Sequence, residues 1–266
     1  MSRRQPDAVT PDRLTFAGHA TVLLELGGRR FLTDPVLRSR LVHLRRVVAP
    51  PPGDLVDDLD GVLLSHLHHD HLDMPSLKRI ARSVPVVTAR GAGRWARRAG
   101  FTEVIELRPG EATELGGVPI TATFAEHDGR RMPRGPHVPA LGYVVGAVRR
   151  VYFAGDTDLF ADMASLGDLD VALLPVWGWG PSLGPGHLPP ERAAEALALL
   201  QPRMAVPIHW GTLRPVGRAG RMKDLLVDPP RAFAREAARL APGVTVEILE
   251  PGETIDLTGR PGAVAS

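Results

Sequence analysis

Six consecutive residues concentrate the side chains that proteins use to bind metal ions. The segment "HLHHDH", residues 66–71, holds four of the ten histidines of the chain together with an aspartate. Alternate residues of an extended turn project to the same side, so His66 and His68 can hold one ion together, with Asp70 and His71 turned toward a neighbouring position. Imidazole and carboxylate suit Zn²⁺ and related divalent ions. The segment therefore predicts a metal centre.

Further candidate ligands follow other apolar runs in the chain. One loop cannot complete two coordination shells, so the prediction requires partners elsewhere. His127 in "FAEHDG", Asp156 in "VYFAGDTD" and His209 in "AVPIHWGT" each stand after an apolar run and before a turn. Taken singly, each is more often an ordinary polar residue or, for Asp156, a cap of the next helix than a metal ligand. Together with residues 66–71 they predict a shared site for two metal ions.

The elements that must position these residues are short apolar strands alternating with helices. Residues 61–64 form a strand that leads directly into His66, and Gly27-Gly28 predicts a hairpin turn. Residues 38–55 suggest a long surface loop or a short helix, and residues 244–257 a closing hairpin. Other strands are expected at 14–16, 20–26, 30–35, 84–89, 102–107, 118–128, 140–147, 149–156, 170–176 and 203–211, and helices at 74–83, 91–100, 159–167, 189–201 and 229–242.

Strands precede helices in both halves of the sequence, and no linker separates the halves. This order favours the α/β (α+β) class, with two sheets packed face to face and helices outside, a four-layer αββα sandwich. We expect a single domain over residues 1–266, built of two similar halves at about 12–128 and 138–258.

Composition excludes several classes of function. The chain has 266 residues and no cysteine, which excludes disulfides, thiolate nucleophiles and thiolate metal ligands. Net charge is only +2, so we expect no nucleic-acid partner. No run approaches the roughly 18 apolar residues of a membrane span, and the basic, apolar segment 38–52 is short. We expect no stable membrane insertion and, because "MSRRQPDAVTPDRL" has no apolar leader, a cytoplasmic location.

The order of the motifs resembles the metallo-β-lactamase superfamily, whose members share the αββα sandwich and bind one or two metal ions at its rim. Within that superfamily the chain is most similar to the N-acyl-phosphatidylethanolamine phospholipase D-like group. The stretches that carry this likeness are "GHATVL", "FLTDP", "RRVVAPPP", "SHLHHDHLD", "FAGDT", "GHLPPERA" and "IHWGT". A more distant likeness is to L-ascorbate-6-phosphate lactonase.

The resemblance implies a role for each candidate. The first metal would be held by His66, His68 and His127, the second by Asp70, His71 and His209, with Asp156 bridging the two. Asp70 has a second candidate role as proton acceptor. The resemblance also places His187, in "GHLPPE", beside the metals and links it to turnover; the alternative is a histidine before a helix with no chemistry.

Two such ions would activate a water molecule and polarise a phosphoryl or carbonyl oxygen. We therefore expect a zinc-dependent hydrolase, with Mn²⁺ or Fe²⁺ as compatible ions, acting on a phosphodiester of a small or lipid-like molecule. The alternative is a lactonase or carboxylic ester hydrolase, and a third hypothesis is a metal-binding module without catalysis. Asp156 stands where the antibiotic-hydrolysing branch has a thiolate, which argues against β-lactam hydrolysis.

Candidate substrate contacts flank the metal motifs. Arginines follow His127 closely, and one guanidinium group can donate two parallel hydrogen bonds to a phosphate. These arginines therefore suggest a phosphorylated small-molecule substrate. The alternative is a basic loop exposed to solvent. The segment "WGWGPSLGPG" offers an aromatic substrate wall, or simply packing residues. The residues concerned are Arg130, Arg131, Arg134, Trp177 and Trp179.

Overall fold

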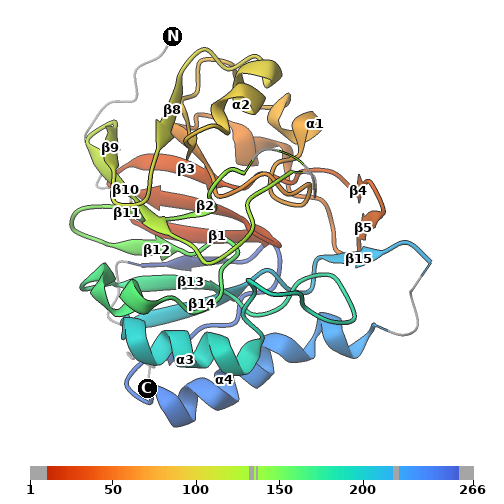
Figure 1. The fold of residues 1–266 in the computed structure, drawn as a ribbon, viewed down its shortest axis with the longest axis vertical. Helices are drawn as coiled ribbons and strands as arrows, with labels where there is room; N and C mark the ends of the chain where they lie inside the picture. Colours follow the sequence, from red (N-terminus) through yellow and green to blue (C-terminus); the bar gives the residue numbers. More distant parts are fainter. Residues whose placement is uncertain (1–10, 132–134, 136, 218–221, 258–266) are drawn as a thin grey trace.

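Two seven-stranded sheets pack face to face, and helices cover both outer faces (Figure 1). The computed structural model describes residues 11–131, 135, 137–217 and 222–257. The helices α1 and α2 lie on one side of the pair of sheets, and α3 and α4 lie on the other. The four-layer αββα sandwich predicted from the sequence is thereby confirmed. None of the helices in the described residues is both long and apolar enough to cross a membrane.

The first sheet is built mainly from the N-terminal part of the chain. Its strands β3, β6, β7 and β8 are parallel, and the predicted hairpin at Gly27-Gly28 joins β2 to β3, with both glycines at positive φ (58° and 74°) as a tight hairpin turn requires. In spatial order the sheet contains β17 (Thr254–Asp256), β1 (Arg13–Gly18), β2 (Thr21–Leu26), β3 (Arg29–Thr33), β6 (Gly61–Leu64), β7 (Val86–Ala89) and β8 (Val104–Leu107). Its helices are α1 (Met74–Leu77) and α2 (Gly93–Ala99).

The second sheet contains two parallel strands that are buried along their whole length. Every residue of β13 and β14 is buried, as expected for parallel strands covered on both faces. In spatial order the strands are β16 (Thr245–Val246), β14 (Met204–Ile208), β13 (Val171–Pro175), β12 (Val151–Phe153), β11 (Leu141–Val145), β10 (Val118–Phe124) and β9 (Ala112–Leu115). The outer helices are α3 (Pro190–Leu200) and α4 (Asp228–Leu240).

A small third sheet replaces the loop or helix expected over residues 38–55. It consists of β4 (Arg40–Leu41), β5 (Leu44–Arg46) and β15 (Leu213–Pro215), and the short 3₁₀ helix η1 (Gly53–Val56) follows it. The strand β5 pairs with β15, which lies far away in the sequence. The prediction was wrong because local sequence carries no sign of that distant partner.

Other local predictions also need correction. The helix expected over 74–83 ends at Leu77, and the one expected over 159–167 is a 3₁₀ helix, η2 (Ala161–Leu166). The closing hairpin over 244–257 does not form, because β16 pairs with β14 in the second sheet whereas β17 pairs with β1 in the first. A further 3₁₀ helix, η4 (Asp224–Leu226), precedes α4.

The sheets do not divide the chain at the expected boundary between halves. The strands β9 and β10 lie within residues 12–128 but belong to the second sheet, and β17 returns to the first. The single domain over residues 1–266 and its division into two similar halves therefore remain predictions.

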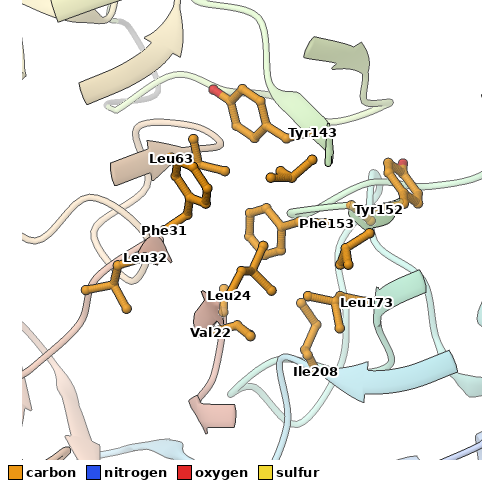
Figure 2. Close-up of a cluster of buried hydrophobic side chains, with 14 of the residues drawn as sticks. Val22, Leu24, Phe31, Leu32, Leu63, Tyr143, Tyr152, Phe153, Leu173 and Ile208 are labelled. Carbon is orange, nitrogen blue, oxygen red and sulfur yellow. The ribbon is translucent and has the colours of Figure 1, made fainter. Parts of the chain in front are cut away.

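The core lies between the two sheets, where apolar side chains of both inner faces meet (Figure 2). Backbone and side-chain hydrogen bonds also join the sheets at one edge. Tyr143 Oη donates to Leu64 O at 2.8 Å, and Leu141 N donates to Ser65 O at 3.0 Å. Gly155 has φ +63°, and a Cβ there would lie 2.7 Å from Ser65 Cβ, so glycine permits this close approach. These contacts hold the end of β6 against the second sheet and so position His66, which follows it.

Polar residues follow the strands at this shared edge. The strands β1 and β3 run parallel, since both pair antiparallel with β2, and β10 and β12 do so through β11. Because parallel strands end on the same side of a sheet, residues that come directly after them converge. The residues that emerge here are His19, Asp34, His66, His127, Asp156 and His209.

Candidate metal centre

Two adjacent groups of ligand-type side chains occupy the shared edge. In each group the candidate ligand atoms all lie within 4.8 Å of one another. The groups are His66, His68, His127 and Asp156, and His19, Asp70, His71 and His209. The structure thus brings together all seven residues predicted as ligands and adds His19, which the sequence analysis did not assign.

The first group has the spacing of a single coordination shell. His68 Nδ1 lies 2.9 Å from His66 Nε2 and 3.1 Å from His127 Nε2. Asp156 Oδ2 lies 3.9 Å from His66 Nε2 and 4.0 Å from His127 Nε2. Ligands bound to zinc at about 2.0–2.1 Å in a tetrahedron are separated by about 3.3 Å. The four side chains are therefore arranged to share one ion.

The second group adjoins the first through Asp156. His71 Nε2 lies 3.1 Å from His209 Nε2 and 3.2 Å from Asp156 Oδ2. His209 Nε2 lies 3.1 Å from Asp156 Oδ1, and Asp70 Oδ2 is 3.8 Å from both imidazoles. The Asp156 carboxylate therefore contacts both groups, which is the position that a bridging ligand requires.

The protonation of the imidazoles follows from the partners of their outer nitrogens. A carbonyl oxygen or a carboxylate can only accept a hydrogen bond, so an Nδ1 facing one must carry a proton, and in the neutral imidazole Nε2 then presents a lone pair. This applies to His71 Nδ1, 2.7 Å from Asp34 Oδ2, to His127 Nδ1, 2.7 Å from Gly186 O, and to His209 Nδ1, 2.6 Å from Trp177 O.

Asp34 orients two of the histidines, His71 directly and His66 through Ser65. Its carboxylate accepts hydrogen bonds from His71 Nδ1, from Ser65 Oγ and from Ser65 N. Since the Ser65 hydroxyl donates to Asp34, its oxygen is free to accept from His66 Nδ1 at 2.9 Å. Asp34 is fully buried. Sequence reasoning quoted "FLTDP" but gave Asp34 no role, although its position at a strand end matches that of the other site residues.

The ring nitrogens converge in a way that only a cation, either a metal ion or a proton on His71, makes favourable. His71 Nε2 and His209 Nε2 face each other, and Asp156 Oδ1 is buried without a hydrogen-bond partner, although His209 Nε2 lies 3.1 Å away. Unpaired acceptors buried together repel one another and forfeit hydration. The donor set and the unpaired oxygen therefore fit divalent metal ions.

The charge states of the site support the same conclusion. Burial lowers the pKa of His209 to about 3 and that of His127 to about 4, and it holds the pKa of His66 well below its usual value. These imidazoles are neutral and can bind metal at neutral pH. Burial alone would raise the pKa of Asp156, but His209 and His71 outweigh it and hold that pKa well below its ordinary value. The bridge is therefore a carboxylate.

Asp70 is held by two donors that the sequence did not indicate. His19 Nε2 lies 3.0 Å from Asp70 Oδ2, and Trp179 Nε1 donates to the same oxygen at 2.9 Å. His19 is fully buried at φ +58°, and its Nδ1 has no hydrogen-bond partner. The only sequence signal for His19 was its place in "GHATVL". The two donors fix the orientation of the Asp70 carboxylate.

A cavity of about 330 Å³ opens onto both groups. One wall is apolar and comes from the third sheet and from the loop after β13, namely Leu41, Val42, Leu44, Trp179 and Leu183. The polar lining comprises His43, His68, His69, Asp70, Asp156, Ser182, His187 and His209. His187 Nε2 lies 3.5 Å from Asp156 Oδ2. His187 therefore lines the cavity beside the candidate metal positions.

The predicted substrate contacts divide into two groups. Trp179 lines the cavity, whereas Trp177 packs against the core and offers its carbonyl to His209. Arg131 donates to Leu67 O and Leu72 O, and so supports the loop that carries the histidines.

Arg130 forms an ion pair with Asp128 at 3.6 Å. Neither Arg130 nor Arg131 is among the residues that line the cavity. Arg134 lies outside the described residues.

Asp34→Asn should weaken the ion held by His71. An amide cannot accept from the imidazole and from both Ser65 donors, because its nitrogen is itself a donor. Loss of such a supporting partner typically lowers metal affinity about 10–100-fold, so we expect less than two ions per chain after dialysis. The measurement is metal content by mass spectrometry, with the exposed Asp54→Asn as control. Unchanged content and affinity in Asp34→Asn would contradict the role of Asp34.

The two metal positions should differ in their sensitivity to acid. Burial would lower the pKa of His71, but Asp156 and Asp70 outweigh it and raise that pKa well above the usual value, whereas the pKa of His127 is about 4. Protons therefore compete for His71 at a higher pH, and affinity falls as pH falls. We expect titration with Zn²⁺ to show the second position emptying first on acidification. Simultaneous loss of both ions would disprove this order.

Comparisons with known proteins agree with the geometry. Residues 29–210 match the model of the β-lactamase superfamily domain. A metal-dependent hydrolase of Opitutus terrae is 37% identical, over 92% of this chain and 100% of its own. N-acyl-phosphatidylethanolamine-hydrolyzing phospholipase D 1 of Caenorhabditis elegans is 34% identical, over 91% and 76%.

Among solved structures, a metallo hydrolase from the archaeon Ignicoccus hospitalis superposes with a TM-score of 0.69 at 25% identity, over 92% of this chain and 98% of that one. The fold, the convergence of the candidate ligands and the sequence similarity all indicate the same family. The chain belongs to the metallo-β-lactamase superfamily and is a metal-dependent hydrolase close to the N-acyl-phosphatidylethanolamine phospholipase D-like group.

Proposed function

We propose that the protein hydrolyses a phosphodiester bond in a small or lipid-like molecule, at a site that holds two divalent ions with zinc preferred. The observation that carries the proposal is the cavity that ends at Asp156, where the imidazole lone pairs of two ligand groups converge. Imidazole and carboxylate ligands without thiolates are compatible with zinc.

The residues proposed to hold the ions are His66, His68 and His127 for the first and Asp70, His71 and His209 for the second, with Asp156 shared. When bound, the ions supply a water molecule of lowered pKa and a Lewis acid for the phosphoryl oxygen. Asp70 lies in the cavity lining and is proposed to take up the proton of the attacking water. His19 and Trp179 hold its carboxylate through Oδ2 and so fix its orientation in the cavity lining.

The charge of the cavity bears on the substrate. Among the described residues that line it there is no lysine or arginine. A phosphomonoester carries about two negative charges near neutral pH, for which protein sites commonly supply guanidinium groups. A phosphodiester carries one, and an uncharged ester none. The lining therefore favours a diester or a neutral ester over a monoester.

The shape and polarity of the cavity add a second constraint. Its wall of Leu41, Val42, Leu44, Trp179 and Leu183 faces the polar end at Asp156. Such a wall favours a substrate with an apolar portion attached to the bond that is cleaved. The Caenorhabditis elegans relative is named for hydrolysing N-acyl-phosphatidylethanolamine. A lipid-like phosphodiester fits both observations.

A lactone or carboxylic ester is the second candidate substrate. The absence of cationic side chains from the described cavity lining fits an uncharged substrate equally well. The same ions would polarise a carbonyl oxygen in place of a phosphoryl oxygen. A cytoplasmic site of action remains a prediction from the sequence.

Hydrolysis of bis(p-nitrophenyl) phosphate by the zinc-loaded protein should be measured beside a panel of lactones and aryl esters. We expect phosphodiester turnover that a chelator abolishes and that added Zn²⁺ restores. The double variant His66→Ala/His68→Ala should show no turnover, because it lacks two ligands of the first group. Lactone opening without phosphodiester hydrolysis would reject the phosphodiesterase proposal in favour of the lactonase. Absence of turnover on every substrate would reject both.

His187→Gln should lower kcat without removing metal. His187 Nε2 is 3.5 Å from Asp156 Oδ2, and its Nδ1 lies 3.2 Å from the carbonyls of Gly184 and Pro185, so Nδ1 carries a proton and Nε2 is directed at the site. Loss of a group that donates or orients at the reacting atoms typically costs about 10²–10⁴-fold.

The matched control is His43→Gln, because His43 also lines the cavity but meets the Trp179 ring edge-on, with ring centroids 5.0 Å apart. Metal content should be unchanged in both variants. An equal kcat for His187→Gln and the wild type would remove His187 from the mechanism.

A further inference from the structure

The outer face of the third sheet presents three arginines in one row. Arg45 of β5 pairs directly with Arg40 of β4 on one side and with Arg214 of β15 on the other. Directly paired residues of an antiparallel sheet point to the same face, with Cβ atoms about 4.5–5.5 Å apart. Arg40 and Arg45 are exposed and Arg214 is partly exposed. The three guanidinium groups therefore form one cationic strip, called here the arginine row.

Nothing in the described part of the chain compensates these charges. None of the three arginines forms an ion pair or a side-chain hydrogen bond with another described residue, whereas Arg29, Arg30 and Arg38 all do. No aspartate or glutamate occurs between residues 35 and 53 or between 209 and 223. Like charges directly opposite each other destabilise a sheet. An external anion would relieve that repulsion.

Apolar side chains border the arginine row. Val47 follows β5 and Val216 follows β15, two residues beyond Arg45 and Arg214 respectively, and they are 38% and 51% exposed. Backbone hydrogen bonds from Val47 N to Thr212 O and from Val216 N to His43 O extend the pairing to these residues. Val42, at the turn between β4 and β5, is 65% exposed. The outer face thus combines fixed positive charge with exposed valines.

The opposite face of the same small sheet belongs to the cavity. Leu41 and Leu44 pack with Leu213 and Trp179, and the turn residues Val42 and His43 line the opening. Figure 1 shows β4, β5 and β15 together at one side of the sandwich, and the cavity lining includes residues of β4 and β5. A surface that contacted the arginine row and Val42 would therefore lie next to the cavity mouth.

We propose that the outer face of the third sheet docks the protein reversibly on an anionic lipid surface, with Arg40, Arg45 and Arg214 on the lipid phosphates and Val42, Val47 and Val216 against the apolar layer. The charge is local, since the whole chain carries a net charge of only +2. Clustered basic residues with apolar neighbours are what peripheral membrane surfaces use. This docking does not depend on the reaction proposed above.

The test is co-sedimentation with vesicles of phosphatidylcholine alone and of phosphatidylcholine with phosphatidylglycerol, at low ionic strength. We expect binding to the anionic vesicles and little to the neutral ones. Each basic residue at an anionic surface contributes about fivefold in affinity, so R40Q/R45Q/R214Q should bind roughly a hundredfold more weakly. Added salt should weaken binding of the wild type more than that of the variant.

The matched control is R98Q/R231Q/R235Q, which removes the same charge from exposed arginines elsewhere. It should retain binding, and thermal unfolding should show both triple variants folded. Equal binding by wild type and R40Q/R45Q/R214Q would overturn the proposal, as would absence of binding to anionic vesicles. Displacement by millimolar inorganic phosphate at constant ionic strength, or retention on single-stranded RNA without vesicle binding, would also overturn it. The assay measures binding only, so a failure here is distinct from failure to hydrolyse phosphodiesters.

Discussion

The site depends on hydrogen bonds that keep a proton on Nδ1 of four of its histidines. Histidine binds a metal only through a nitrogen that carries no proton, and a buried imidazole adopts the tautomer that its outer partner imposes. In this protein a carboxylate, two backbone carbonyls and a hydroxyl take the outer protons of His66, His71, His127 and His209. In their neutral forms, which for His71 requires the loss of a second proton, the four imidazoles present their inner nitrogens as lone pairs near Asp156.

Those outer partners come from distant parts of the fold, so the site depends on the whole sandwich. Asp34 follows β3 in the first sheet, and the carbonyl of Trp177 belongs to the loop after β13 in the second. The sheets are joined at the same edge by Tyr143 Oη on Leu64 O. A shift of one sheet against the other would separate His66 and His71, which follow the first sheet, from Asp156 and His209, which follow the second.

The third sheet connects the site to its surroundings. Its inner face packs on Trp179, whose indole nitrogen donates to Asp70, and its outer face carries the arginine row formed by Arg40, Arg45 and Arg214. Three short strands thus position a candidate metal ligand, form the apolar wall of the cavity and present an unpaired cationic surface. Strands this short owe their stability to the packing beneath them, because isolated strand pairs are marginally stable in water.

The sequence by itself determined most strands of the two large sheets, the helices α2, α3 and α4, the αββα class and the seven residues that converge at the site. Strand-end positions reveal such residues because parallel strands bring the residues at their carboxyl ends to one edge of the sheet. The tertiary structure alone decided the pairing of β5 with β15, the crossing of the C-terminal segment between sheets, and the roles of His19 and Asp34. Those features rest on hydrogen bonds between residues far apart in the chain, and neither periodicity nor local composition records such partners.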